Sequence, residues 1–432
     1  MKILYVTSHF LPQSIGGLEL HIYRLAKEIS KTDQILIFCN GKDLEKEDYL
    51  IEDLRYDGIN IRRINYTYRD FTEFKDGYIN KKIEREFEKI LDVYQPDIVD
   101  IHHLGGLSTT IIQSIKKKGI PLVLTLHDYW LICPKGQRIR DDDLTLSETI
   151  DRERCASCLQ SALSARQRSP LWRLFEFFKS SQTAFAKQLF EYDQHIRQML
   201  RLPDVIITPT EFFRREFIKY GVRSERIKTI GHGLDLDLFN NVTRTSSTKT
   251  RFGYIGSVIP SKGVHVLIEA FNKFQRNDVS LSIFGEVKTF HGDTGYGERL
   301  RKLLTPGKDV TFYGRYENEH IPHVLSEIDV LVVPSLWHES FSIVIREGFL
   351  ARVPVIATDL GAMKEAIEDE KTGLLFERGN ADHLFEQMRR LVEDKELKAR
   401  ISNNGVSVKH IRENAQELLT LYKELVGSKI AE

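Results

Sequence analysis

Cysteine is scarce in this chain, which has only four in 432 residues. Four cysteines do not build a disulfide framework at this length, so reduced thiols and a cytoplasmic location are expected. No apolar run approaches the roughly 18 residues of a membrane span, and the apolar stretch in residues 1–12 is too short for a signal peptide. Formal net charge is zero, which argues against a nucleic-acid partner.

Repeats of about 20 to 50 residues are absent too, which argues against a solenoid. Short apolar runs instead alternate with helical patterns, which predicts parallel sheets with helices on both faces. The expected strands cover residues 2–6, 35–39, 59–64, 97–102, 122–126 and 205–208, and then 251–255, 280–284, 309–312, 329–333 and 353–357. The polar stretch Thr243–Thr250 resembles a linker. We therefore expect domains at 1–240, with an insertion at about 133–202, and at 250–410, followed by a helix at 411–432.

The stretch Pro334–Gly348, PSLWHESFSIVIREG, concentrates the features of a binding site. It follows an apolar run that suits a buried strand, and helical spacing begins at Ser342. Glu339 then falls just before a helix N-terminus, and Glu347 a little over one turn inside the helix. Open α/β sheets bind ligands at the carboxyl ends of their strands, where helix N-terminal N–H groups can hold phosphate. The pattern predicts a site for a phosphorylated polyhydroxy ligand.

Other turns carry polar residues or glycines at expected strand ends. Gly16–Gly17 opens a helix whose N–H groups could approach an anion, although a plain tight turn is the alternative interpretation. His102–His103 and His127–Asp128 share one sheet edge, although a single histidine there is more often structural. Gly256–Gly263, GSVIPSKG, places Lys262 at a helix start without Walker A spacing, and a solvated lysine is the alternative.

Taken in this order, the motifs resemble those of the retaining glycosyltransferases of family 4, and the resemblance spans nearly the whole chain. It rests on the two glutamates separated by seven residues, on VPVIATDLGAMKE after them, and on HDYWLICP, which resembles a bacterial subgroup. The resemblance implies the GT-B fold, an α/β architecture with two Rossmann-like domains facing across a cleft. The first domain would bind the acceptor and the second the donor nucleotide, and the C-terminal helix would cross back to the N-terminal domain.

Carried over residue by residue, the resemblance gives the second domain most of the donor contacts. Glu347 would bind the ribose, Glu339 would contact hydroxyls of the transferred sugar, and Lys262 would neutralise the leaving diphosphate. The implied catalytic residues are His127, Lys262 and Glu339. Further donor contacts are implied at Gly16, Gly17, Ser257, Arg315, Phe341 and Ser342, and acceptor contacts are expected at His103 and Asp128.

The implied reaction is front-face transfer with retention of configuration, in which the leaving diphosphate helps to deprotonate the acceptor hydroxyl. A covalent nucleophile at Glu339 is the alternative, but a glycosidase needs a paired acid, and no second carboxylate is assigned to that place. Such transferases usually need no divalent metal, so no cofactor is expected beyond a UDP-, GDP- or other nucleotide sugar. Many members have an arginine where this chain has Ser257, which leaves Lys262 as the obvious cation of that turn.

The insertion between the strands ending at about 126 and starting at 205 is not an ordinary Rossmann connection. Cys133, Cys155 and Cys158 could hold a structural zinc with a fourth ligand, but no fourth cysteine is nearby in the sequence, and unligated thiols are the alternative. Ser169–Phe190 mixes aromatic with basic side chains. It could contact an anionic membrane or a lipid-linked acceptor, or its helices could pack over the first domain.

The sequence therefore predicts a retaining glycosyltransferase that moves a sugar from a nucleotide donor to a saccharide or lipid-linked acceptor. Bacterial cell-surface polysaccharide or glycan synthesis is the expected setting, with peripheral contact at the inner face of the membrane as an option. A sugar-nucleotide epimerase of the same fold is one alternative, and a non-catalytic scaffold subunit is another. The motifs fix neither the sugar, the base nor the acceptor.

Overall fold

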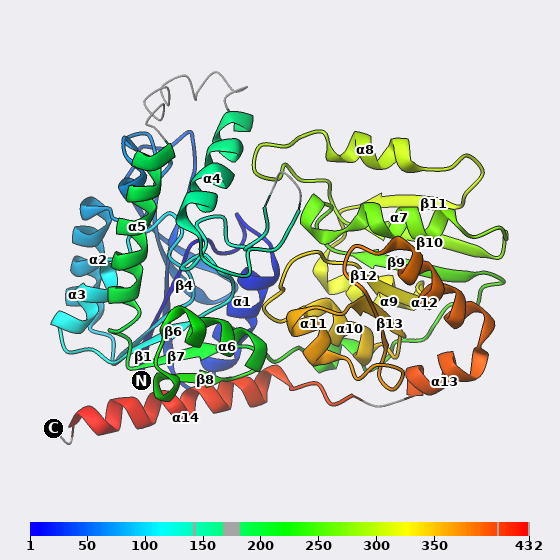
Figure 1. Ribbon diagram of the computed structural model, residues 1–432. Helices are drawn as coiled ribbons and strands as arrows, with labels where there is room; N and C mark the ends of the chain where they lie inside the picture. The colour runs from blue at the N-terminus through cyan, green and yellow to red at the C-terminus, as the bar shows by residue number, and fades with distance from the viewer. Residues whose placement is uncertain (141–143, 167–181, 404–405, 431–432) are drawn as a thin grey trace. The chain divides into compact units, whose positions relative to one another are not determined.

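The computed structural model describes residues 1–140, 144–166, 182–403 and 406–430. The chain forms two compact units, each built on its own sheet (Figure 1). The first unit comprises Met1–Gly136, Lys187–Leu234 and Lys409–Glu432, and the second comprises Gln137–Ala186 and Asp235–Val408. The predicted α/β class with two Rossmann-like sheets is confirmed.

The sheet of the first unit has the strand order β3-β4-β2-β1-β5-β6-β7-β8. Its neighbouring strands are parallel, apart from the antiparallel pair β3 and β4. The strands are β1 (Lys2–Thr7), β2 (Gln34–Asn40), β3 (Ile51–Tyr56), β4 (Ile59–Ile64), β5 (Ile98–Ile101), β6 (Leu122–Thr125), β7 (Val205–Thr208) and β8 (Ile227–Thr229). Strand order reverses between β1 and β5, so their carboxyl ends border the crevice where such sheets bind ligands.

Helices cover this sheet because their apolar stripes need burial. In α2, Asn80 accepts hydrogen bonds from the backbone N–H groups of Lys82 and Ile83 and so caps the helix start. Ile83 and Phe87 of the same helix are buried. The helices are α1 (Gly17–Ile29), α2 (Lys81–Tyr94), α3 (Ile111–Lys117), α5 (Gln182–Met199), α6 (Glu211–Tyr220) and α14 (Ile411–Ile430).

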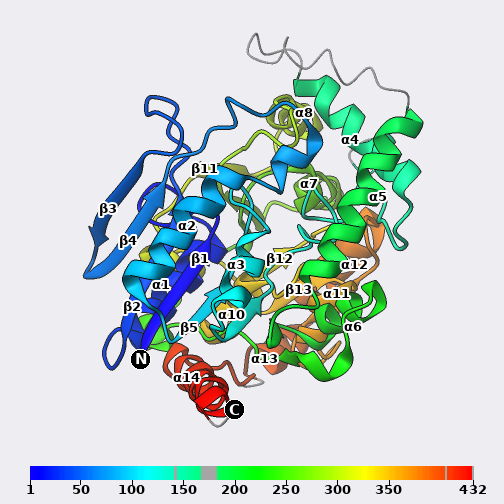
Figure 2. The ribbon, with the colours of Figure 1, turned by 90° about the vertical axis from the view of Figure 1, so that its left-hand side faces the viewer.

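The last helix, α14, completes the core of the first unit, at the same end as the N-terminus of the chain (Figure 2). Leu418 and Leu421 belong to one apolar cluster with residues of α1 and β1. Deeper in, the Tyr422 hydroxyl donates to Asp100 Oδ2 at 2.5 Å and lies 3.2 Å from the hydroxyl of Tyr5. The predicted return of the C-terminal helix to the first domain is thus confirmed.

Asp100 should make stability fall as the pH rises. Burial raises the pKa of its carboxyl from 3.8 to about 6, partly offset by hydrogen bonds from Tyr422 and Thr125. At pH values between these two pKa values, the Asp100 carboxyl has lost its proton in the unfolded chain but still holds it in the folded chain. This difference amounts to about 3 kcal/mol of lost stability between about pH 4 and pH 6.

Urea denaturation of the wild type and of Asp100→Asn across that pH range measures the effect. We expect the wild type to lose about 3 kcal/mol relative to the variant, which has no such proton to release. Parallel pH profiles for the two proteins would contradict the assignment.

The sheet of the second unit has the order β11-β10-β9-β12-β13-β14 and is parallel throughout. Its order reverses between β9 and β12, which marks the ligand crevice of this unit. The strands are β9 (Thr250–Ile255), β10 (Val279–Phe284), β11 (Val310–Gly314), β12 (Val330–Val333), β13 (Val355–Thr358) and β14 (Leu374–Phe376). The helices are α4 (Arg152–Arg166), α7 (Val264–Asn272), α8 (Tyr296–Leu303), α9 (Ile321–Ser326), α10 (Ile343–Leu350), α11 (Gly361–Ala366), α12 (Ala381–Glu393) and α13 (Lys395–Asn403).

Three strands escaped the sequence pattern. β8 and β14 have three residues each, and β3 is an antiparallel edge strand with exposed side chains in its middle. Such short or exposed strands carry no continuous apolar run that would reveal them. Within the expected linker, the backbone N–H and hydroxyl of Thr245 both donate to Ser326 O. This part of the linker is therefore anchored to the second unit.

The aromatic and basic segment predicted at Ser169–Phe190 lies largely outside the described residues. Of its described end, which belongs to α5, Phe185 and Leu189 are buried and Phe190 is 55% exposed. Among the described helices, none combines the length and apolar character that a membrane crossing needs.

Candidate active site

Lys262 and Glu339 form an ion pair at the crevice of the second sheet. Lys262 ends a short 3-10 turn after β9, and Glu339 lies in the loop after β12, the two strands at which the order reverses. Lys262 Nζ lies 2.7 Å from Glu339 Oε1. The same carboxylate accepts a hydrogen bond from the Ser335 hydroxyl. The structure thus joins two residues that the sequence had placed separately.

The surroundings of the pair keep the carboxylate charged. Burial acts to raise the pKa of Glu339, but the ammonium of Lys262 and the hydroxyl of Ser335 more than offset it, so the pKa lies below its ordinary value. Glu339 is 5% exposed, whereas the Lys262 side chain is 25% exposed. Lys262 Nζ also lies 5.5 Å from the centre of the Trp337 ring, a cation–π distance. The ammonium is therefore the partner that a ligand from solvent can reach.

Gly263 allows the two loops to approach each other. Its φ is +70°, a conformation that favours glycine. A Cβ atom at this position would lie 1.9 Å from the carbonyl oxygen of Pro334. Beside it, the backbone N–H of Leu336 donates to Ser261 O at 2.8 Å. The glycine after Lys262 thus fixes the distance between the lysine turn and the loop that carries Glu339.

Helix α10 begins at Ile343, one residue later than the sequence pattern predicts. Ser342, the N-cap, has a φ of +59°, and Phe341 and Ser342 are both buried. Their peptide groups stand at the end of the helix where N–H groups lack intrahelical partners. Glu347 lies one turn into the helix, as predicted, with its side chain partly exposed.

Arg346, which supports this helix, and Tyr316, which lies near the charge of Glu347, were missed by the sequence analysis. Arg346 donates to the carbonyl oxygens of Phe341 and Ser342, and its guanidinium lies 4.1 Å from the centre of the Phe341 ring. Burial lowers its pKa to about 10. Burial and the nearby charge of Glu347 raise the pKa of Tyr316. No periodicity separates such an arginine or tyrosine from an ordinary surface residue.

The start of the insertion contacts the loop that carries Glu339. Arg378 donates from Nε to Leu336 O at 2.7 Å, and its guanidinium also donates to Leu144 O. His338 Nε2 lies 3.5 Å from a carboxylate oxygen of Glu148. These contacts place the part of the insertion around Leu144 and Glu148 beside the candidate donor site of the second unit.

Ser257 and Arg315, the other predicted donor residues of this unit, also follow strands of its sheet. Ser257 comes after β9, and its carbonyl oxygen accepts a hydrogen bond from the Tyr254 hydroxyl at 2.7 Å. Arg315 follows the edge strand β11 and is exposed. Within the described part of the chain, no hydrogen bond or ion pair joins Ser257 or Arg315 to the Lys262–Glu339 pair, so both donor contacts stay predictions.

In the first unit, Gly16–Gly17 opens α1 after β1, as predicted. A Cβ atom on Gly16 would lie 2.7 Å from Glu19 Oε2, and the other oxygen of this carboxylate accepts from the Ser14 hydroxyl at 2.9 Å. An acidic side chain therefore lies against the glycine turn. His21, on the same helix, is buried.

His103 and Asp128, the predicted acceptor contacts, form a hydrogen-bonded pair. His103 Nδ1 accepts from the backbone N–H of Gly105 at 3.0 Å, so Nε2 carries the proton that faces Asp128 Oδ2 at 3.3 Å. Burial acts to lower the pKa of His103, but the charge of Asp128 offsets it and the pKa is raised. Trp130 donates its backbone N–H to Asp128 Oδ1 at 2.8 Å.

A cavity of about 20 Å³ is lined by these residues together with His102 and His127. A space of this size is close to that of one water molecule and too small for a sugar ring. His127 itself has both ring nitrogens within hydrogen-bond distance of other histidines, at 3.0 Å from His102 and 3.3 Å from His232. No sequence pattern indicates His232, because it follows the short strand β8.

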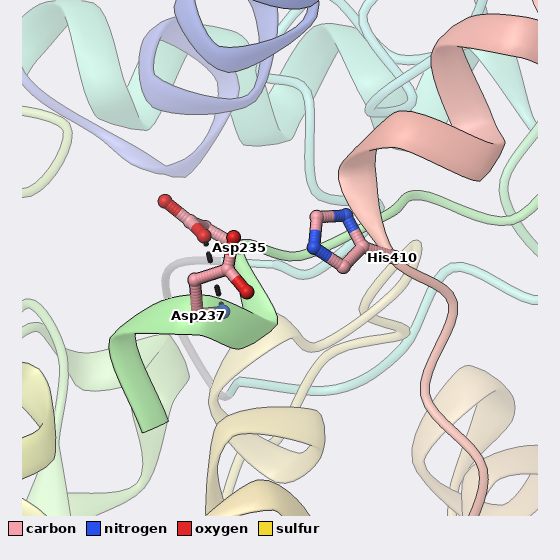
Figure 3. Close-up of side chains that lie close together, drawn as sticks. All are labelled: Asp235, Asp237 and His410. Atoms are coloured by element: carbon pink, nitrogen blue, oxygen red, sulfur yellow. Dashed lines mark hydrogen bonds between the residues drawn. The ribbon is translucent and has the colours of Figure 1, made fainter. Parts of the chain in front are cut away.

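Cys133, Cys155 and Cys158, considered above as a possible but not the preferred zinc site, form no disulfide bond with any described cysteine. Among the described residues, Cys133, Cys155 and Cys158 do not form a group of three close metal ligands. Asp235 accepts from the backbone N–H of Asp237 at 3.2 Å and caps the turn Leu236–Phe239 (Figure 3). His410, drawn in the same figure, belongs to the first unit, whereas Asp235 and Asp237 belong to the second.

Two glycosyltransferase family models together match most of the sequence. The model for Glycosyltransferase Family 4 matches residues 15–238, and the model for Glycosyl transferases group 1 matches residues 237–408. The chain therefore belongs to glycosyltransferase family 4, as the motifs predict.

Curated relatives are distant. An uncharacterized 42.6 kDa protein in the cps region of Klebsiella pneumoniae is 23% identical over 84% of this chain and 87% of its own length. The putative glycosyltransferase YtcC of Bacillus subtilis is 27% identical over 54% of this chain and 63% of its own length. An uncharacterized glycosyltransferase of Methanocaldococcus jannaschii, MJ1178, is 27% identical over 47% of the chain and 60% of its own length. The chain thus spans less than two thirds of some relatives that it matches.

Solved structures share the fold. Anabaena Alr3699/HepE, in complex with UDP and glucose, has a TM-score of 0.67 at 18% identity, covering 98% of this chain and 100% of that one. Sucrose-phosphate synthase from Thermosynechococcus elongatus has a TM-score of 0.69 at 17% identity, covering 99% of each chain. These likenesses identify the GT-B fold.

Proposed function

We propose that this chain is a retaining glycosyltransferase that moves a sugar from a nucleotide-sugar donor to a saccharide or lipid-linked acceptor. The observation that carries the proposal is the Lys262–Glu339 ion pair where the strand order of the second sheet reverses, with Glu347 one turn into the following helix. A cation for a diphosphate and two carboxylates for hydroxyl groups match the polar parts of a nucleotide sugar.

Donor binding would separate Lys262 from Glu339, because each residue would bind a different group of the donor. The diphosphate offers Lys262 more negative charge than one carboxylate does, so the partly exposed ammonium would turn toward it. Oε1 of Glu339, which also accepts from the Ser335 hydroxyl, could then accept a hydrogen bond from a hydroxyl of the transferred sugar in place of the ammonium. Glu347 would accept from the ribose hydroxyls. Lys262 and the N–H groups at the start of α10 would stabilise the charge that develops on the leaving diphosphate.

The acceptor would bind to the first unit, where His103 and Asp128 present a hydrogen-bonded pair. In our proposal the leaving diphosphate takes the proton of the acceptor hydroxyl, so no side chain is assigned as general base. His127 would contact the transferred sugar. No divalent metal is needed, and activity should persist in excess EDTA.

Cell-surface polysaccharide or glycan synthesis is the proposed setting. The support is that two relatives are named as proteins in the cps region of Klebsiella pneumoniae. A cytoplasmic location with peripheral contact at the inner face of the membrane fits a lipid-linked acceptor. Because the HepE structures hold UDP, UDP-glucose, or UDP with glucose, uridine nucleotides are the first donors to test.

A thermal-shift screen of UDP, GDP and ADP tests the donor site. A nucleotide at a hundred times its dissociation constant should add about 2.7 kcal/mol of stability. Glu347→Ala should weaken that nucleotide about tenfold or more, because it loses charge-assisted hydrogen bonds to the ribose. The variant should therefore need correspondingly higher nucleotide concentrations to show the same rise in melting temperature. A variant with unchanged affinity would refute the ribose assignment.

Product analysis separates the alternatives. A transferase yields a glycoside whose anomeric configuration, read by NMR, matches that of the donor. An epimerase would consume or interconvert the donor with no acceptor present, and a scaffold subunit would bind no nucleotide of the screen. Retained configuration with acceptor-dependent turnover supports the proposal, and any of the other outcomes overturns it.

A further inference from the structure

Three histidines of the first unit are connected ring to ring. His102 follows β5, His127 follows β6 and His232 follows β8, so loops at the carboxyl edge of one sheet supply them. His102 Nδ1 lies 3.0 Å from His127 Nε2, and His127 Nδ1 lies 3.3 Å from His232 Nε2. His102 and His232 are 2% and 6% exposed. We call this set the histidine chain.

One end of the histidine chain faces a buried carboxylate. His102 Nε2 lies 3.8 Å from Asp100 Oδ2 and has no hydrogen-bond partner within the described residues. Asp100 accepts hydrogen bonds from the hydroxyls of Thr125 and Tyr422. With a pKa of about 6, it carries its charge at neutral pH. A ring lone pair would be repelled by this charge, whereas an N–H group is attracted, so the His102 proton belongs on Nε2.

The position of that proton sets the positions of the others. A neutral imidazole has one N–H donor and one acceptor nitrogen. With Nε2 protonated, His102 accepts at Nδ1, so His127 must donate from Nε2. Nδ1 of His127 is then an acceptor, and it receives the N–H of His232 Nε2. The N–H groups therefore all point the same way: His232 donates to His127, and His127 donates to His102.

Burial keeps the rings of His102 and His127 neutral. It lowers the pKa of His102 to about 3, and burial together with nearby His232 lowers the pKa of His127 well below its ordinary value. The other ionisable groups facing the rings are His21, whose ring centre lies 3.9 Å from that of His232, the more distant His103, and Tyr5 against His102. Burial lowers the pKa of His21 to about 3 as well. The assignment of N–H and acceptor nitrogens along the histidine chain therefore holds at neutral pH.

We propose that His102 and His232 are positioning residues for His127: they hold its ring between them and impose the tautomer with the proton on Nε2. His127 can then meet a substrate hydroxyl only as an acceptor, through Nδ1, when that hydroxyl displaces the more distant partner, His232. This consequence for substrate recognition rests on the proposed transferase function. The tautomer itself does not.

NMR of 15N-labelled protein at pH 7 tests the tautomer directly. Long-range proton–nitrogen correlation spectra distinguish a protonated from an unprotonated ring nitrogen, and a His127→Gln spectrum assigns the signals among the 14 histidines. We expect His127 with a protonated Nε2 and an unprotonated Nδ1. The opposite tautomer, an equal mixture or a doubly protonated ring would overturn the proposal, whether or not any sugar is transferred.

Matched variants test the two neighbours. An asparagine amide can occupy the place of Nδ1 and a glutamine amide that of Nε2, so His102→Asn and His232→Gln can keep their contacts with His127. His102→Leu and His232→Leu cannot. We expect the leucine variants to lose the single tautomer and to lower kcat about tenfold or more, the size typical for partners that orient a functional imidazole.

The amide variants should retain the His127 tautomer signal and more activity than the leucine variants do. Equal effects of amide and leucine at both positions, with the tautomer unchanged in all four variants, would show that the neighbours only fill space and would overturn the proposal. If the wild type transfers no sugar, the proposed function fails while the NMR result still decides on the tautomer.

Discussion

Replacing Lys262 with methionine should lower the free energy of unfolding of the second unit by about 3 kcal/mol and remove nearly all transferase activity. The structural reason is that Glu339 is 5% exposed and its carboxyl would be left buried without its ion-pair partner. Removing one member of a buried pair typically costs about 3 to 5 kcal/mol, and the partial exposure of Lys262 places the cost at the lower end. Urea denaturation and donor turnover measure the two effects.

The double variant Lys262→Met, Glu339→Gln separates stability from activity. It removes both charges, and the new amide oxygen can still accept the hydrogen bond of Ser335. We expect most of the lost stability to return, because neutral residues of similar volume often replace a buried ion pair without cost. Activity should stay at least about a hundredfold below that of the wild type, since the diphosphate has lost its cation. A double variant as unstable as Lys262→Met would refute the pairing argument.

Gly263→Ala should be nearly as damaging, although it adds a single methyl group. The added Cβ would lie 1.9 Å from the carbonyl oxygen of Pro334, so one of the two loops must move. The positive φ adds about 1 to 2 kcal/mol for any residue with a Cβ. We expect a total loss of about 3 kcal/mol in urea denaturation. Because the loops carry Lys262 and Glu339, turnover should fall by at least about tenfold as well.

Gly307→Ala is the matched control for this prediction. Gly307 also lies in the second unit and also has a positive φ, +83°, but nothing lies within 4 Å of the Cβ position. Its substitution should therefore cost only the backbone term of about 1 kcal/mol and leave donor turnover unchanged. Equal losses from the two substitutions would mean that the loop contact at Pro334 contributes nothing.

Sequence patterns predicted the sheets because buried parallel strands read as continuous apolar runs, such as Val330–Val333. They also placed Glu339 before a helix and Glu347 inside it, because strand and helix patterns meet at Pro334–Gly348. The family followed from several motifs in one order. Each of these inferences depends on residues that are neighbours in the sequence.

What the sequence could not predict depends on residues far apart in the chain. The contact of Lys262 with Glu339 joins positions 77 residues apart, and His232 meets His127 across 105 residues. Arg346 resembles a surface arginine until its carbonyl partners are known. Side-chain pairing of this kind arises only from the packing of complete elements, so neither periodicity nor spacing carries a signal for it.

The return of α14 has a consequence for how the protein is made. Tyr422, whose hydroxyl binds Asp100, is synthesised 322 residues later. At roughly 5 to 20 residues per second, translation takes roughly 15 to 60 s to cover that distance. During this time the first sheet lacks the helix that closes its core, while residues 235–408 of the second unit have all been added. The part of the protein that begins first on the ribosome is therefore the one whose folding is completed last.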